Sequence, residues 1–146
     1  RICKGIYLEP ADVAFTNYQE IVEATNLAID SMLQKGAYVA IASHDDPIIS
    51  HALDSLIKND MGPGESDPRT NSGPKSNGKG NGYEFQFLLG VRGDKRRILA
   101  KEGHLTRIYL PYGLRWYEYS MRRLRENPEI ATHVAKAFFL PWTNRR

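Results

Sequence analysis

Short apolar runs alternate with amphipathic stretches along the chain, and this alternation predicts strands and helices in turn. The apolar runs predict four strands, at residues 1–7, 37–43, 83–89 and 105–110. Helical periodicity follows each run, at about residues 17–35, 47–59, 93–102 and 114–126, and a short closing helix is expected at about 129–139. Four strand-then-helix units are typical of a parallel sheet covered by helices, so the predicted fold class is α/β.

The second helix has a recognisable start, and the segment after it lacks a helix or strand pattern. Asp45 and Asp46 before Pro47 predict an N-cap followed by proline at the first helical position. Residues 60–82 are rich in glycine, serine and asparagine, with Met61 as their one large apolar residue, and predict a disordered insert. Its closing glycines precede a strand, whereas phosphate-binding turns follow one, so a flexible linker is favoured.

The four units leave two architectures open. They are too few to close a barrel. An open sheet that starts at Arg1 would leave a strand with a buried-type sequence unpaired at its edge. Half of a (β/α)8 barrel would remove this difficulty, but a flavodoxin-like sheet shows the same alternation. Because the chain starts without Met inside a strand-like run, we expect it to begin within a domain.

Composition narrows the class of protein. With 41% hydrophobic and 25% charged residues, residues 1–146 predict one ordinary globular domain. The sequence has no stretch of roughly 18 apolar residues and no signal-peptide pattern, so a cytoplasmic location is expected. The net charge of +3 is spread along the chain and does not favour nucleic-acid binding, and the single Cys3 excludes an internal disulfide and a four-cysteine metal site.

Functional groups of a (β/α)8 barrel lie at the carboxyl ends of its strands, here residues 5–9, 43–46, 86–92 and 109–113. On the third strand, alternation places Glu84 and Gln86 on one face with Leu88, opposite a face made of Tyr83, Phe85, Phe87 and Leu89. The two polar side chains either hydrogen-bond neighbouring strands or face a ligand. Arg1 shares its strand face with Cys3, Gly5 and Tyr7, and is either a surface residue or an interior cation with a partner.

Two further clusters have alternative explanations. Tyr119, Arg122, Arg123 and Glu126 share one face of the predicted helix at 114–126, which is either a solvated face or a clamp for a carboxylate ligand. His44, Asp45 and Asp46 could hold a metal, although adjacent strand residues point apart and both aspartates already suit a helix start. A Ser43/His44 nucleophile and base is weaker, because adjacent residues seldom face each other.

Five segments together resemble the monofunctional, bacterial-type proline dehydrogenases, which are FAD enzymes: RICKGIYLEPA, VAIASHD, YEFQFLLGVR, RIYLPYG and WYEYSMRRLREN. In this order and spacing they are highly specific, and they correspond to strands five to eight and the eighth helix of that family's (β/α)8 barrel. The resemblance therefore implies the C-terminal half of such a barrel. The upstream half of the same barrel would carry further FAD and substrate contacts, so the fragment alone is expected to be inactive.

The resemblance also implies roles for individual residues. Arg1 matches the residue that hydrogen-bonds the flavin near N5, and is the catalytic candidate. The other implied FAD contacts are Lys4, Gly5, Ile6, Ser43, His44 and Gln86. The implied proline contacts are Leu88, Tyr109 and Tyr119, with Arg122 and Arg123 on its carboxylate and Glu126 as their ion partner. Ile6 stands where many members have Ala, Ser43 where Thr is usual, and the insert is a further departure.

The activity implied is hydride transfer from C5 of L-proline to FAD N5, giving 1-pyrroline-5-carboxylate. A quinone is the implied electron acceptor, with peripheral contact at the inner face of the cell membrane. Two alternatives stay open from the sequence: a metal-dependent hydrolase on the same barrel with His44, Asp45 and Asp46 as ligands, and a non-catalytic interaction module.

Overall fold

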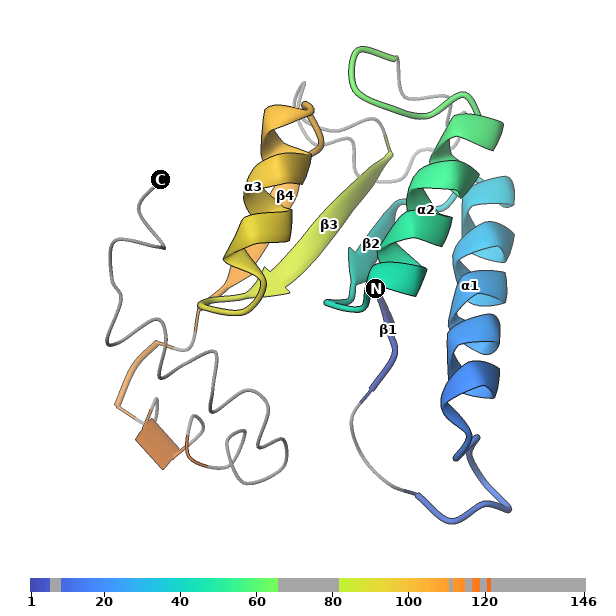
Figure 1. Ribbon diagram of the computed structural model, residues 1–146, viewed down its shortest axis with the longest axis vertical. Coiled ribbons are helices and arrows are strands. Elements are labelled where there is room, and N and C mark those ends of the chain that lie inside the picture. Colours follow the sequence, from blue (N-terminus) through green and yellow to red (C-terminus); the bar gives the residue numbers. More distant parts are fainter. Residues whose placement is uncertain (6–8, 66–81, 111, 115–116, 119–120, 122–146) are drawn as a thin grey trace.

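The computed structural model describes residues 1–5, 9–65, 82–110, 112–114, 117–118 and 121. Strands and helices alternate in this part of the chain (Figure 1). The elements are β1 (Ile2–Cys3), α1 (Tyr18–Gln34), β2 (Val39–Ala42), α2 (Asp46–Lys58), β3 (Tyr83–Leu88), α3 (Gly93–Lys101) and β4 (Thr106–Tyr109).

The strands form one parallel sheet in the order β1-β2-β3-β4. Ile41 pairs with Ile2 on one side and with Phe85 on the other, and Phe85 pairs in turn with Thr106. Each strand is therefore the neighbour of the next one along the chain, which is the order that successive βα units produce. The predicted α/β class with a parallel sheet is confirmed.

The core lies between the helices and one face of the sheet. Tyr83, Phe85 and Phe87 are all buried on that face of β3, as the two-residue alternation predicts. The buried stripe of α1, Val22, Thr25, Ile29 and Leu33, repeats every three or four residues and packs onto the same core. Ile48, Ile49, Ala52 and Leu56 of α2 and Leu99 of α3 complete it.

The predicted elements are largely present, with three corrections. Of the strand expected at 1–7, only Ile2–Cys3 is a strand among the described residues, and it ends before Gly5, whose φ is 80°. The helix expected at 47–59 begins at Asp46, so Pro47 is not its first residue, and Asp45 makes no capping bond with its side chain. Leu89 was expected on the face of Phe87, but β3 ends at Leu88 and Leu89 is 52% exposed at the turn before Gly90. The turn ends the alternation, because Gly90 takes a left-handed backbone conformation with φ of 81°.

Other predictions fall partly outside the described residues. At the start of the predicted insert, Met61 is 4% exposed in the core and its N–H donates to the Leu56 carbonyl at 2.9 Å. Residues 66–81 lie outside the described part, so disorder there stays a prediction. The same is true of most of the helix predicted at 114–126, although residues 117, 118 and 121 are helical, and of all of 129–139.

Candidate functional site

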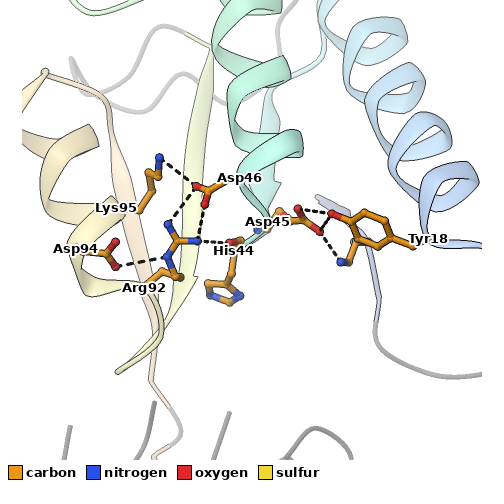
Figure 2. Close-up of polar contacts among 9 residues, drawn as sticks. Tyr18, His44, Asp45, Asp46, Arg92, Asp94 and Lys95 are labelled. Atoms are coloured by element: carbon orange, nitrogen blue, oxygen red, sulfur yellow. Dashed lines mark hydrogen bonds and ion pairs between the residues drawn. The ribbon is translucent and has the colours of Figure 1, made fainter. Parts of the chain in front are cut away.

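Polar side chains gather where the parallel strands end. Lys4 and Gly5 follow β1, Ser43 and His44 follow β2, and residues 89–92 follow β3. Because parallel neighbours end at the same edge of a sheet, segments far apart in the chain meet here. Figure 2 shows the polar contacts that join them.

Asp45 ties the end of β1 to the start of α1. Its carboxylate accepts a hydrogen bond from Lys4 Nζ at 2.6 Å and from the Tyr18 hydroxyl at 2.9 Å. Lys4 Nζ also lies 4.9 Å from the centre of the Tyr18 ring. The hydrogen bond to Asp45 raises the pKa of Tyr18 above its ordinary value, so the phenol keeps its proton. Three elements therefore meet on one carboxylate.

Asp46 faces the other way and binds the loop after β3. The Arg92 guanidinium donates two bonds to it, each 3.1 Å long, and Lys95 Nζ lies 3.1 Å from the same carboxylate. The hydrogen bonds from Arg92 and Lys95 hold the pKa of Asp46 below its usual range. Arg92 also pairs with Asp94 at 3.5 Å, and its own pKa is raised chiefly by Asp46. This cluster joins α2 to α3.

His44 lies between these two ion pairs. Its Nε2 accepts a hydrogen bond from the Leu88 backbone N–H at 3.0 Å, and its carbonyl accepts one from Arg92 at 3.1 Å. A backbone N–H can only donate, so Nε2 carries a lone pair and the imidazole is neutral with its proton on Nδ1. The ring also contacts Phe87, with centroids 5.7 Å apart. The position and the tautomer of His44 are thus both fixed by β3 and its loop.

The described residues give the metal-site hypothesis no support. Asp45 and Asp46 point in opposite directions (Figure 2), and each carboxylate is neutralised by a cation of the protein. The Nε2 of His44 is occupied by the Leu88 backbone. Within the described residues no group of three His, Cys, Asp or Glu side chains could hold a metal. The hydrolase alternative, which needed these three ligands, therefore has no support.

Ser43 and His44 are not paired as a nucleophile and base. Ser43 is buried, and its hydroxyl oxygen accepts a hydrogen bond from the Asp45 backbone N–H at 3.2 Å. This bond fixes the turn between β2 and α2. The imidazole next to it points to β3 instead.

Glu84 forms a second polar centre, on the sheet face opposite the helix-covered core. It is 2% exposed, and its carboxylate accepts hydrogen bonds from Arg107 at 2.7 and 2.8 Å, from the Tyr38 hydroxyl at 3.0 Å, and from the Gln86 amide. Burial raises the pKa of Glu84, but the bonds from Arg107, Gln86 and Tyr38 outweigh it and hold the pKa below its usual range. Glu84 is therefore a buried, ionised carboxylate bonded to neighbouring strands, one of the two explanations that the sequence left open.

The remaining predicted site residues are distributed as follows. Arg1 is exposed and precedes β1 on the face of Cys3, and Gln86 and Leu88 are half-buried on the face of Glu84. Tyr109 ends β4 next to Leu88 and is 46% exposed. Predictions for Ile6, Tyr119, Arg122, Arg123 and Glu126 concern residues outside the described part.

Sequence reasoning missed the cations that organise the site. Arg92 and Lys95 bind Asp46, and Arg107 binds Glu84, yet none of the three was singled out. Arg107 carried a usable signal, because alternation along β4 places it on the face of Tyr109, where the parallel register sets it beside Gln86. Arg92 gave no such signal, since its contacts depend on the conformation of a loop.

The groups at this edge suit a large planar ligand with both donors and acceptors, such as a flavin. Gly5 has φ of +80°, and a Cβ built on it would meet no atom within 4 Å, so a ligand can approach its backbone closely. His44 presents an oriented imidazole, and Gln86 presents an amide. Lys4 fits less well, because its ammonium is held by Asp45.

Comparison with known proteins agrees with the resemblance seen in the sequence. No protein-family model matches the chain. Proline dehydrogenase of Deinococcus radiodurans is 33% identical over 136 residues, which are 93% of this chain and 38% of that protein. Proline dehydrogenases 1 and 2 of Bacillus subtilis are 35% and 37% identical over 140 and 142 residues, covering 93% and 94% of the chain and 39% of each relative. The chain is therefore a homologue of bacterial proline dehydrogenases over almost all of its length, and it spans about two fifths of theirs.

Proposed function

We propose that residues 1–146 form the C-terminal half of an FAD-dependent proline dehydrogenase, built as strands five to eight of a (β/α)8 barrel. The protein would oxidise L-proline to 1-pyrroline-5-carboxylate. The observation that carries the proposal is the similarity to three proline dehydrogenases over at least 93% of the chain. The required partner is the upstream half of the same barrel, which would pair with the edges of β1 and β4.

FAD would accept the hydride, and the chain would bind and orient it. Gly5 leaves space for the ring system beside the end of β1, and the imidazole of His44 lies at the end of the next strand. Gln86 faces the same side of the sheet as Arg1, the residue that we assign to the flavin N5 region. Ser43 would contact the cofactor through its O–H, because accepting the Asp45 N–H leaves the hydroxyl able to donate.

Substrate binding rests on the sequence motif that resembles the family. Arg122 and Arg123 would hold the proline carboxylate, because paired guanidinium groups suit a planar anion, and Glu126 would orient one of them. Tyr109 and Leu88 end neighbouring strands and would line the ring of proline together with Tyr119. Holding the carboxylate at one end and the flavin at the other would fix C5 in position for transfer.

A quinone is the proposed electron acceptor, reached by peripheral contact with the inner face of the cell membrane. In the described residues, no helix has the length and apolarity needed to cross a membrane. Peripheral contact needs no such helix, only an apolar or charged surface.

The test is the visible absorbance of the purified complete enzyme, recorded without oxygen before and after L-proline is added. Bleaching of a bound yellow chromophore is expected, since oxidised and reduced flavin differ in colour. D-Proline is the matched control, because it has the same atoms with the carboxylate placed differently on the ring. A colourless protein would overturn the cofactor assignment, and a yellow protein that L-proline fails to bleach would overturn the substrate.

A further inference from the structure

Glu84 is an unusual residue to find buried on the sheet face opposite the helix-covered core. Its carboxylate accepts hydrogen bonds from three residues: Tyr38 just before β2, Gln86 on β3 and Arg107 on β4. Its carboxylate is almost fully buried, whereas the Arg107 side chain that neutralises it is 63% exposed. Buried ion pairs contribute little net stability relative to apolar residues of the same size. Fold stability alone therefore explains this cluster poorly.

The cluster determines which way the Gln86 amide is turned. An ionised carboxylate can only accept hydrogen bonds, so the group that Gln86 directs at Glu84 must be its NH2. The Gln86 carbonyl oxygen then lies on the opposite side of the amide, away from Glu84. An amide could present either end to a ligand, but the carboxylate removes that choice.

Gln86 is also the residue between Glu84 and the strand ends. It lies two positions after Glu84 on the same face, and Leu88, two positions further, donates its backbone N–H to His44. Gln86 therefore stands one step along the strand from the carboxyl edge where the proposed site lies. It is half-buried, in contrast to Glu84, and so can contact a ligand.

We propose that Glu84 is a positioning residue, which holds the Gln86 amide so that its carbonyl oxygen faces the flavin as a hydrogen-bond acceptor. This inference rests on the proposed function. The chemical complement of an acceptor is an N–H, and the isoalloxazine ring carries one at N3, with a second at N5 only after reduction. Arg107 donates two charge-assisted bonds to Glu84 and keeps the carboxylate fixed and ionised, while Tyr38 adds one neutral bond.

A double-mutant cycle in the complete enzyme separates this role from a structural one. Glu84→Gln keeps the shape but can offer Gln86 either an oxygen or an NH2, so the orientation is lost. Gln86→Leu removes the acceptor. We expect each single variant to weaken FAD binding to the apoprotein by about tenfold, the equivalent of one hydrogen bond, and to shift the flavin midpoint potential. The double variant should bind FAD no more weakly than Gln86→Leu, because Glu84 acts through Gln86.

Tyr38→Phe is the matched control. It removes one neutral partner of Glu84 but leaves the bond to Gln86, so FAD affinity should stay within about twofold of wild type. If the two main effects multiply in the double variant, Glu84 acts by charge or through the fold, and the inference is wrong. It is equally wrong if Glu84→Gln binds FAD as wild type does.

Two further outcomes are distinguishable. If the wild-type enzyme binds no flavin, both the proposed function and this inference are wrong. If the wild-type enzyme binds FAD, the variants test this inference alone and leave the proposed function standing. If Glu84→Gln does not fold, Glu84→Gln/Arg107→Met removes both charges together and keeps the side chains of similar size. The same cycle against Gln86→Leu is then run in the Arg107→Met background.

Discussion

Arg92 allows a quantitative test of how the site is assembled. Its backbone has φ of 48° and ψ of 45°, the left-handed region, at the N-cap of α3. From there its guanidinium reaches the His44 carbonyl and Asp46, each at 3.1 Å. The side chain thus joins the ends of β2 and β3, and the backbone is strained to bring it there.

The cost of removing this side chain follows from its partners. The charge-assisted bond to the partly buried His44 carbonyl is worth about 1.5–3 kcal/mol. The pair with Asp46, whose side chain is 55% exposed, adds about 0.2–1 kcal/mol because solvent screens it. Arg92→Ala should therefore lower the free energy of unfolding by about 2–4 kcal/mol.

Arg92→Gly is the matched variant, because it loses the same contacts but relieves the strained backbone. A left-handed conformation destabilises a residue with a Cβ by about 1–2 kcal/mol, and Arg92→Gly avoids this cost. The greater conformational freedom of glycine in the unfolded chain destabilises Arg92→Gly by about 0.5–1 kcal/mol, which offsets part of the gain. Arg92→Gly should thus be more stable than Arg92→Ala by up to about 1.5 kcal/mol. Urea unfolding of both variants in the full chain measures the difference. If Arg92→Ala unfolds like wild type, or if glycine is the less stable of the two, the reasoning is refuted.

Three further predictions concern pH, substrate and the second carboxylate. Burial lowers the pKa of His104 below its ordinary 6.5, so the unfolded chain binds the proton more readily than the folded one. The free energy of unfolding should therefore fall as the pH drops below 6.5, which urea titrations at several pH values measure. If the same pH dependence persists in His104→Gln, it belongs to another group. Arg123→Ala should raise the KM for proline by roughly two decades or more, because charge-assisted bonds to the carboxylate are lost, and an unchanged KM would contradict the clamp. Asp45→Asn should lower the free energy of unfolding by about 1–2 kcal/mol through its weakened bond to Lys4, and a smaller loss in urea titrations would show that the pair is screened.

The sequence predicted the elements well because the helices and strands here follow their hydrophobic periods. Val39 to Ala42 is a short apolar run and forms a strand with neighbours on both sides. The errors occur at ends, where local chemistry decides. Asp45 does stand at the N-cap of α2 as expected, but its carboxylate makes no capping bond, because it accepts hydrogen bonds from Lys4 and Tyr18 instead.

The site was predicted by location rather than by contact. Among the described residues, those expected at the strand ends do lie there, because parallel strands bring them to one edge. Which of them touch depends on register and loop conformation, neither of which the sequence displays. Arg92 shows this limit, since its contacts require a left-handed backbone that few residues other than glycine adopt.

The two adjacent aspartates show why residue types in a cluster do not define its chemistry. In sequence, His44, Asp45 and Asp46 have the composition of a metal site. In the structure, the chain passes from strand to helix at this point, so that the two carboxylates diverge and each meets a cation from a different element. A metal would have to compete with these cations, and displacing Lys4 would take its partly buried ammonium away from the carboxylate that neutralises it. The same three residues instead hold three strand ends in a fixed arrangement, and a neutral, oriented imidazole lies between them. That is the arrangement a site needs when a bound cofactor supplies the reactivity and the protein supplies only position.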